Sequence, residues 1–217
     1  MSETVQTLPL LYIIGDSISI QYGPYLERYL AGHYRYARRS QQGDADYRLN
    51  LDVPVGTNNG DSRMVLEYLT QLEQGGQFHP DLLLINAGLH DVKTDPQTRQ
   101  RQVSPADYRT NLQGIVALAK RLARRVVWIT TTPADETVHN TPATTFHRFA
   151  ADVADCNAAA REIMSAAGIP LLDLFAFTQS LGLTGKELYA DHVHFPEPVR
   201  QLQAAHIAGW VVGKFAS

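Results

Sequence analysis

The chain has little cysteine, little charge and no long apolar run. Its 217 residues include a single cysteine, Cys156, so no internal disulfide can form and we expect a buried structural thiol. No segment approaches the roughly 18 apolar residues that cross a membrane. Charged residues make up 19% and the net charge is −3, which gives no basic surface for nucleic acid. These absences exclude a disulfide-stapled scaffold, a membrane-spanning protein and a nucleic-acid binder.

The length and the start of the chain set further expectations. Hydrophobic residues make up 44%, and 217 residues fit one globular domain, 1–217, with a sizeable core. The first five residues lack the basic region and apolar core of a signal peptide. The sequence as given therefore predicts a cytoplasmic protein, and a leader removed before this sequence begins would reverse that prediction.

Strand and helix patterns alternate along the chain, which predicts an α/β fold with a parallel sheet covered on both faces. We expect strands at residues 10–14, 48–55, 81–86, 126–131 and 169–174, and helices at 24–31, 62–73, 105–121, 148–167 and 197–215. The second strand has the weakest pattern. Two long loops, 88–103 and 133–147, follow strands at the edge where such folds place their chemistry, so we expect them to shape a substrate cleft.

A buried strand is followed at once by Gly15, Asp16 and Ser17. A serine on a sharp turn between a strand and a helix stands clear of the sheet, where it can act as a nucleophile. The bland alternative is an ordinary helix N-cap, because Asp and Ser favour that position. This alternative stays open until the other end of the chain is considered.

Near the C-terminus, Asp191 precedes His194 by three residues. This spacing lets a carboxylate orient an imidazole, and the imidazole can then take the proton of a serine hydroxyl. Ser17, Asp191 and His194 would form a triad in the chain order Ser, Asp, His. His192 competes as the base, but the spacing favours His194.

A serine acyl transfer also needs hydrogen-bond donors for the developing oxyanion. Gly60 precedes an expected helix, and such a loop commonly offers a free backbone N–H. Gly88, Leu89, His90 and Asp91 follow the third strand of the expected sheet. We therefore expect the oxyanion hole to consist of the Ser17 N–H, the Gly60 N–H and a side chain near His90.

These four segments together resemble the SGNH (GDSL-type) hydrolase superfamily. Gly15-Asp16-Ser17 is similar to its first block, Gly60 to its second, Gly88 to Asp91 to its third, and Asp191 to His194 to its fifth. The blocks occur in the family order over nearly the whole chain. The resemblance implies a three-layer α/β/α sandwich with a flavodoxin-like, five-stranded parallel sheet. It also implies ester hydrolysis through an acyl-enzyme, without metal or cofactor.

The third block departs from the family pattern, because His90 stands where the family has Asn. An imidazole N–H can donate as an amide does, so we expect His90 to keep the oxyanion role. Protonation of His90 near neutral pH would then change activity. Asn86 or the backbone alone are the alternative donors.

Other polar residues of these segments are candidates for substrate binding. We expect the carboxylate of Asp91 to fix its own loop and His192 to line the wall of a cleft. Arg148 would bind an anionic group of a substrate. His139 is expected to be exposed to solvent. The candidates for substrate binding are Asn59, Asn86, Asp91, Arg148 and His192.

The residues favour a serine esterase acting on small acyl esters, acetyl esters first, with carbohydrate esters suggested by the long polar loops. A lysophospholipase or thioesterase of the same fold is the nearest alternative. Two alternatives come from other classes. His90, Asp191, His192 and His194 have the residue types of a zinc or manganese site, which would make a metal-dependent hydrolase. The second alternative from another class is a binding module that has this fold but no catalytic activity.

Overall fold

The computed structural model describes residues 7–39, 51–141 and 145–215. Within them, five parallel strands form one sheet in the order β2-β1-β3-β4-β5, which confirms the α/β class and the flavodoxin-like sheet. The strands are β1 (Leu10–Ile14), β2 (Arg35–Arg38), β3 (Leu82–Ile85), β4 (Val126–Ile129) and β5 (Leu171–Leu172). The helices are α1 (Ser17–Tyr29), α2 (Ser62–Gly75), α3 (Pro105–Leu122), α4 (Glu136–His139), α5 (Ala150–Ala166), α6 (Leu174–Ser180), α7 (Gly185–Leu188) and α8 (Glu197–Phe215).

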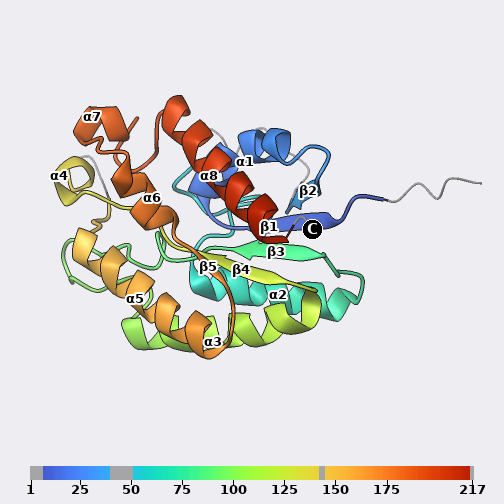
Figure 1. Cartoon of the computed structure of the whole chain (residues 1–217). Helices are drawn as coiled ribbons and strands as arrows, with labels where there is room; N and C mark the ends of the chain where they lie inside the picture. The colour runs from blue at the N-terminus through green and yellow to red at the C-terminus, as the bar shows by residue number, and fades with distance from the viewer. Residues whose placement is uncertain (1–6, 40–50, 142–144, 216–217) are drawn as a thin grey trace, which may run out of the picture.

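Helices cover both faces of the sheet (Figure 1). Helices α1, α6 and α8 lie on one face, and α2, α3 and α5 lie on the other. Every residue of β3 and β4 is buried, as expected for interior strands of a parallel sheet that is covered on both sides. The core is therefore continuous from one helical layer through the sheet to the other.

Strand β1 lies inside the sheet, and the end of the chain returns to it. β1 pairs with β2 on one side and with β3 on the other. Helix α8 packs along α1, which starts directly after β1. The residues just before α8 are therefore brought to the carboxyl end of β1, although more than 170 positions separate them in sequence.

The edge strand lies elsewhere than predicted. β2 is formed by Arg35–Arg38, where no strand was expected. Residues 51–55 form a turn followed by irregular backbone, and residues 48–50 of the predicted strand lie outside the described part. Val53 and Val55 are exposed, because β2 follows α1 directly and already occupies this edge of β1.

Helix α1 begins at Ser17, seven residues before the predicted start. The Asp16 carboxylate accepts a hydrogen bond from the Ile18 N–H at 3.0 Å and so caps the helix. Pro24 lies inside α1 and not in its first turn. The cap decides where the helix starts, and the proline does not.

The two long loops are joined by a backbone pair. Thr94 and His147 each donate their N–H to the carbonyl of the other at 2.8 Å.

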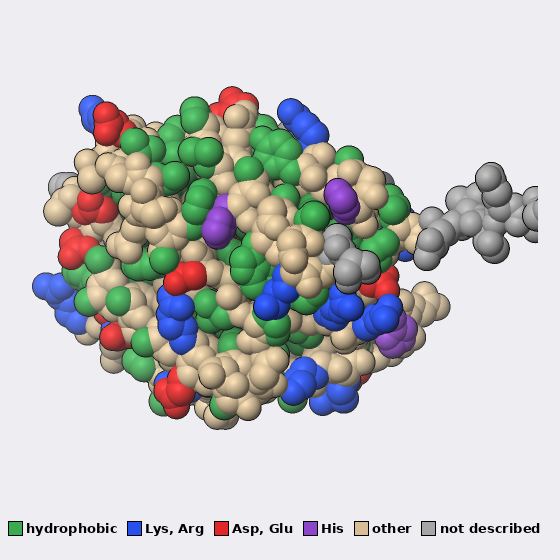
Figure 2. All heavy atoms as spheres, viewed as in Figure 1, with side chains coloured by type: hydrophobic (Ala, Val, Ile, Leu, Met, Phe, Trp, Pro, Cys, Tyr) green, Lys and Arg blue, Asp and Glu red, His purple; other side chains and the backbone are tan. Residues whose placement is uncertain are grey.

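Figure 2 shows acidic and basic side chains on the same face of the molecule, with Lys and Arg side chains most frequent at the lower right of the view. None of the helices in the described ranges is long and apolar enough to cross a membrane.

Candidate active site

Ser17 occupies the first turn of α1, at the carboxyl end of β1. The Asp16 side chain fixes this turn, and burial raises the pKa of that carboxyl group. Ser17 is 2% exposed, so its hydroxyl lies at a site from which bulk water is largely excluded. Because Ser17 is the first residue of the helix, its backbone N–H has no carbonyl partner within α1.

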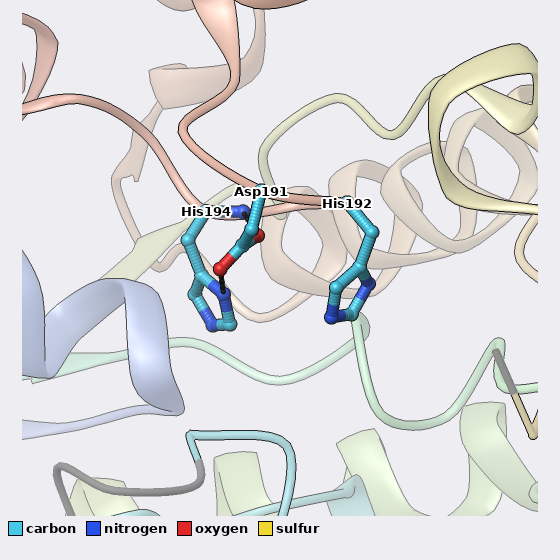
Figure 3. Close-up of side chains that lie close together, drawn as sticks. All are labelled: Asp191, His192 and His194. Atoms are coloured by element: carbon cyan, nitrogen blue, oxygen red, sulfur yellow. Dashed lines mark hydrogen bonds and ion pairs between the residues drawn. The ribbon is translucent and has the colours of Figure 1, made fainter. Parts of the chain in front are cut away.

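The structure brings Ser17, Asp191 and His194 together in one hydrogen-bonded chain. His194 Nε2 lies 2.9 Å from Ser17 Oγ, and His194 Nδ1 lies 2.8 Å from Asp191 Oδ2. Asp191 Oδ1 also accepts the backbone N–H groups of Val193 and His194. In Figure 3 the carboxylate of Asp191 lies beside the ring of His194, in the segment between α7 and α8. The short loop thus holds the carboxylate and the ring in one fixed arrangement.

The electrostatics of the hydrogen-bonded series Ser17, His194 and Asp191 suit proton transfer from the serine to the histidine. Burial alone would raise the pKa of Asp191, but hydrogen bonds from the His194 ring and from two backbone N–H groups hold it well below its usual range. A charged carboxylate accepts the Nδ1–H of His194. The lone pair of Nε2 then faces the Ser17 hydroxyl, as a general base requires.

The sequence as a whole matches a known family over most of its length. The profile of the GDSL-like lipase/acylhydrolase family covers residues 13–198, which include the three residues of the triad arrangement. The chain belongs to the GDSL-like lipase/acylhydrolase family. It is therefore a GDSL-like acylhydrolase, a carboxylic ester hydrolase. No curated protein matches this acylhydrolase in sequence.

Solved structures share the fold of this acylhydrolase. A lipase/acylhydrolase from Enterococcus faecalis is 19% identical with a TM-score of 0.70, over 95% of this chain and 97% of that one. An acetyl xylan esterase from Geobacillus stearothermophilus is also 19% identical with a TM-score of 0.61, over 94% of each chain. The catalytic domain of a Streptococcus pneumoniae peptidoglycan O-acetyltransferase is 20% identical with a TM-score of 0.59, over 96% and 95%. At these identities the likeness concerns the fold.

The backbone N–H of Gly60 is not free, in contrast to the prediction. It donates to Asn58 Oδ1 at 3.0 Å, because the asparagine side chain closes a tight turn over its own loop. Gly60 has a φ of +65°, and a Cβ there would lie 2.7 Å from Pro54 Cβ and 2.5 Å from Met64 Sδ. The turn and these close contacts are sufficient reasons for a glycine at this position.

His90 is buried, and neither of its ring nitrogens has a hydrogen-bond partner in the described ranges. Burial lowers the pKa of His90 well below its usual value, and the charges of Lys93 and Arg148 lower it further. The prediction that His90 changes its charge near neutral pH is therefore wrong. The ring is neutral there, and one of its two nitrogens holds a hydrogen that no described group accepts.

The structure gives several other predicted site residues local partners. Asn86 donates to the Ile129 carbonyl at 2.9 Å and to Thr131 Oγ1 at 3.4 Å, so both amide hydrogens have acceptors. Asp91 accepts the Ser62 N–H at 3.0 Å and the Ser62 hydroxyl, and so fixes its loop. Asn86 and Asp91 therefore lie in the frame of the site.

Arg148 is also buried rather than presented to a cleft. Its Nε donates to the Leu89 carbonyl at 2.8 Å, and its guanidinium lies 4.8 Å from the centre of the Phe146 ring. Burial lowers the pKa of Arg148 to about 10, although nearby carboxylates act in the opposite sense. The side chain links the loop after β4 to the loop that contains His90.

Sequence reasoning missed a second group of titratable residues beside the triad. His192 Nε2 lies 2.8 Å from Asp52 Oδ2, and His192 Nδ1 lies 2.7 Å from His139 Nδ1. His139 is buried, not exposed as predicted, and its burial lowers its pKa to about 4. The pairing joins two loops and the end of α4, which are far apart in sequence, so no local pattern could have shown it.

This group bears on the metal hypothesis. Asp191, His192 and His194 have ligand atoms within 4.8 Å of one another, and Figure 3 shows the two rings side by side. Both nitrogens of each ring are engaged in hydrogen bonds, those of His192 to His139 and Asp52. A metal ion would have to replace these bonds, so the donor set fits a hydrogen-bonded network better than a metal centre.

Proposed function

We propose that this acylhydrolase cleaves small acyl esters, acetyl esters above all, through an acyl-enzyme on Ser17. The observation that carries the proposal is the continuous chain from Ser17 Oγ through His194 to Asp191, with bonds of 2.9 and 2.8 Å. Nucleophile, base and orienting carboxylate in this order are the requirement for serine acyl transfer.

In the first half of the reaction, His194 Nε2 takes the proton of Ser17 as Oγ attacks the ester carbonyl. The negative charge on the carbonyl oxygen is stabilised by the Ser17 N–H and by the N–H of the His90 ring. The Gly60 N–H already donates to Asn58 Oδ1, so it could reach the oxyanion only as a hydrogen bond shared between the two acceptors. The alcohol leaves with the proton from His194. Water then attacks the acyl-enzyme with His194 as base, and the acid is released.

A polar alcohol is favoured as the leaving group. A groove of about 460 Å³ lies between the segment after β4 and the segment from α6 to α7, and Tyr189, two residues before Asp191, lines it. Asp135, Gln179 and Thr184 supply polar groups on its walls. Leu183, Leu188 and Tyr189 make much of the remaining wall apolar. Such a mixed wall suits the ring faces and hydroxyl groups of a carbohydrate, and acetyl xylan esterases are among the proteins that share the fold.

The test compares two serines of the same turn. We expect Ser17→Ala to lower kcat on 4-nitrophenyl acetate by about 10³-fold or more with the fold intact. Ser19→Ala, the matched control, keeps most of the activity, because Ser19 Oγ donates to the Asp16 carbonyl at 2.6 Å, away from the triad. Turnover by Ser17→Ala at the wild-type level would refute the proposal, and loss of wild-type turnover in a chelator would favour a metal-dependent hydrolase.

A series of 4-nitrophenyl esters of increasing acyl length separates the substrate classes. A small-acyl esterase shows its highest kcat/KM with acetate and a steep fall toward longer chains. A maximum at eight carbons or more would favour the lysophospholipase alternative. Acetate release from acetylated xylooligosaccharides, but not from simple acetylated alcohols of equal concentration, would support carbohydrate esters.

A further inference from the structure

The oxyanion hole of this enzyme has fewer free donors than the family pattern leads one to expect. Acyl transfer is accelerated by N–H groups that already point at the developing charge. Here the Gly60 N–H donates to Asn58 Oδ1, and position 90 is a histidine, which has no side-chain amide. The Ser17 N–H and one His90 N–H remain, so a further donor would complete the usual set of three.

Asn59 lies at the nucleophile turn. Its backbone N–H donates to the Gly15 carbonyl at 3.1 Å, two residues before Ser17. Its side chain is 1% exposed, and neither Oδ1 nor Nδ2 has a hydrogen-bond partner in the described part of the chain. Leaving a buried amide without a hydrogen-bond partner destabilises the folded protein, so its presence in a native site calls for a purpose.

The residues on either side of Asn59 hold it in place. Asn58 donates to the Leu51 carbonyl at 2.9 Å and accepts the Gly60 N–H. Two residues after Gly60, the N–H of Ser62 donates to Asp91, the neighbour of His90. The backbone of Asn59 is therefore tied to the Ser17 turn, and the segment that follows it is tied through Ser62 to the loop that contains His90.

We infer that the Asn59 carboxamide is a catalytic donor that binds the oxyanion through Nδ2–H, as the third donor beside the Ser17 N–H and the His90 ring, in place of the Gly60 N–H that Asn58 occupies. This inference rests on the proposed acyl transfer at Ser17. As Oγ bonds to the carbonyl carbon, the carbonyl oxygen becomes the acceptor that the buried amide lacks in the free enzyme. The cost of the unsatisfied amide is then relieved in the transition state.

The test uses Asn59→Leu, which keeps the volume and removes the donor. We expect kcat on 4-nitrophenyl acetate to fall about 10²–10³-fold with KM nearly unchanged. The melting temperature stays equal or rises, because an unpartnered buried amide is replaced by an apolar group. A purely structural asparagine would show the reverse, a lower melting temperature and nearly normal kcat. Activity of Asn59→Leu within about threefold of wild type would overturn the inference.

Asn59→Asp provides a second variant of the same shape, in case leucine is not accommodated. It removes the donor and adds an acceptor, so we expect an equal or larger loss of kcat and weaker inhibition by an arylboronic acid, which forms a tetrahedral adduct on serine. Undiminished boronate affinity would count against the donor role. If Ser17→Ala is inactive while both Asn59 variants are active, the Asn59 inference alone fails; if Ser17→Ala is active, the proposed function fails.

Discussion

Single buried side chains determine much of the chemistry around Ser17. Asp52, His139 and Arg148 all lie within the same cluster of charges, and each has a pKa moved from its ordinary value. Burial alone would raise the pKa of Asp52, but the hydrogen bond from His192 and nearby positive charge lower it to about 2. His139 has a pKa of about 4 and is neutral at physiological pH. Near pH 7, Asp52 and Arg148 are therefore charged and His139 is neutral.

Position 90 offers a direct comparison of two donors. Since His90 is neutral near pH 7, we expect His90→Asn to retain at least a tenth of wild-type kcat/KM, because an amide N–H replaces the imidazole N–H. His90→Leu should lose about 10²-fold. The acid limb of the pH profile should be the same in His90→Asn and wild type, and a limb that moves would show that His90 itself titrates.

Asp91 links stability to pH. Burial raises the pKa of Asp91 to about 7, although hydrogen bonds from Ser62 act in the opposite sense. The folded state then binds more protons than the unfolded state between about pH 4 and 7, so the free energy of unfolding falls as pH rises through this window. We expect wild type to lose on the order of 4 kcal/mol across this window from this group.

The measurement is urea unfolding of Asp91→Asn and wild type at pH 5 and pH 8. The asparagine variant should lose less stability between the two values. Asp155→Asn, at an exposed position on α5, serves as the control and should keep the wild-type dependence. Equal pH dependence in Asp91→Asn and wild type would contradict the assigned titration.

At the scale of elements, close approach between helices fixes the layer below the sheet. Helices α2 and α3 pack against each other, and Gly114 of α3 faces Leu66 of α2. A Cβ at position 114 would lie 2.9 Å from Leu66 Cδ1. A side chain at position 114 would therefore require the Leu66 side chain to shift.

A pair of glycine substitutions tests this contact. Gly209 lies on an exposed face of α8, and a Cβ there meets nothing within 4 Å. We expect Gly209→Ala to raise the free energy of unfolding by about 0.5–1 kcal/mol, because alanine favours the helix. Gly114→Ala should show no gain or a loss, since Leu66 must move. Equal gains in chemical denaturation would mean that the α2–α3 contact is looser than described.

For the molecule as a whole, the two ends of the chain build one site. Helix α8 packs on α1, and this contact places His194 against Ser17. Local loosening of α8 would therefore separate nucleophile and base. Activity and global folding are coupled through the same interface.

Cys156 provides a probe of global unfolding, because it is the only cysteine of the chain. It is 5% exposed on α5, and burial raises the pKa of its thiol to about 12. We expect a thiol reagent to label the native protein slowly, at a rate that rises with denaturant in step with unfolding. Labelling within seconds in the absence of denaturant would show that α5 opens independently of the rest.

The sequence by itself determined the alternation of strands and helices and the residue types of the triad, because periodicity and short motifs are local properties. It predicted the sheet correctly except for the edge strand, where a weak alternation at 48–55 competed with Arg35–Arg38. The roles of Ser17, Asp191 and His194 stay predictions, although the structure brings the three together.

Only the tertiary structure decided which donors around Ser17 are free. A sequence cannot show that the Gly60 N–H is bound by Asn58, that His139 is buried against His192, or that the Asn59 carboxamide has no partner among the residues that the structure describes. The burial of His139 against His192 depends on segments that are far apart in sequence and meet at the carboxyl edge of the sheet, whereas the bond from Gly60 to Asn58 closes a turn within one loop. Hydrogen-bond satisfaction and burial arise from such long-range contacts, and they decide the chemistry that the motif alone leaves open.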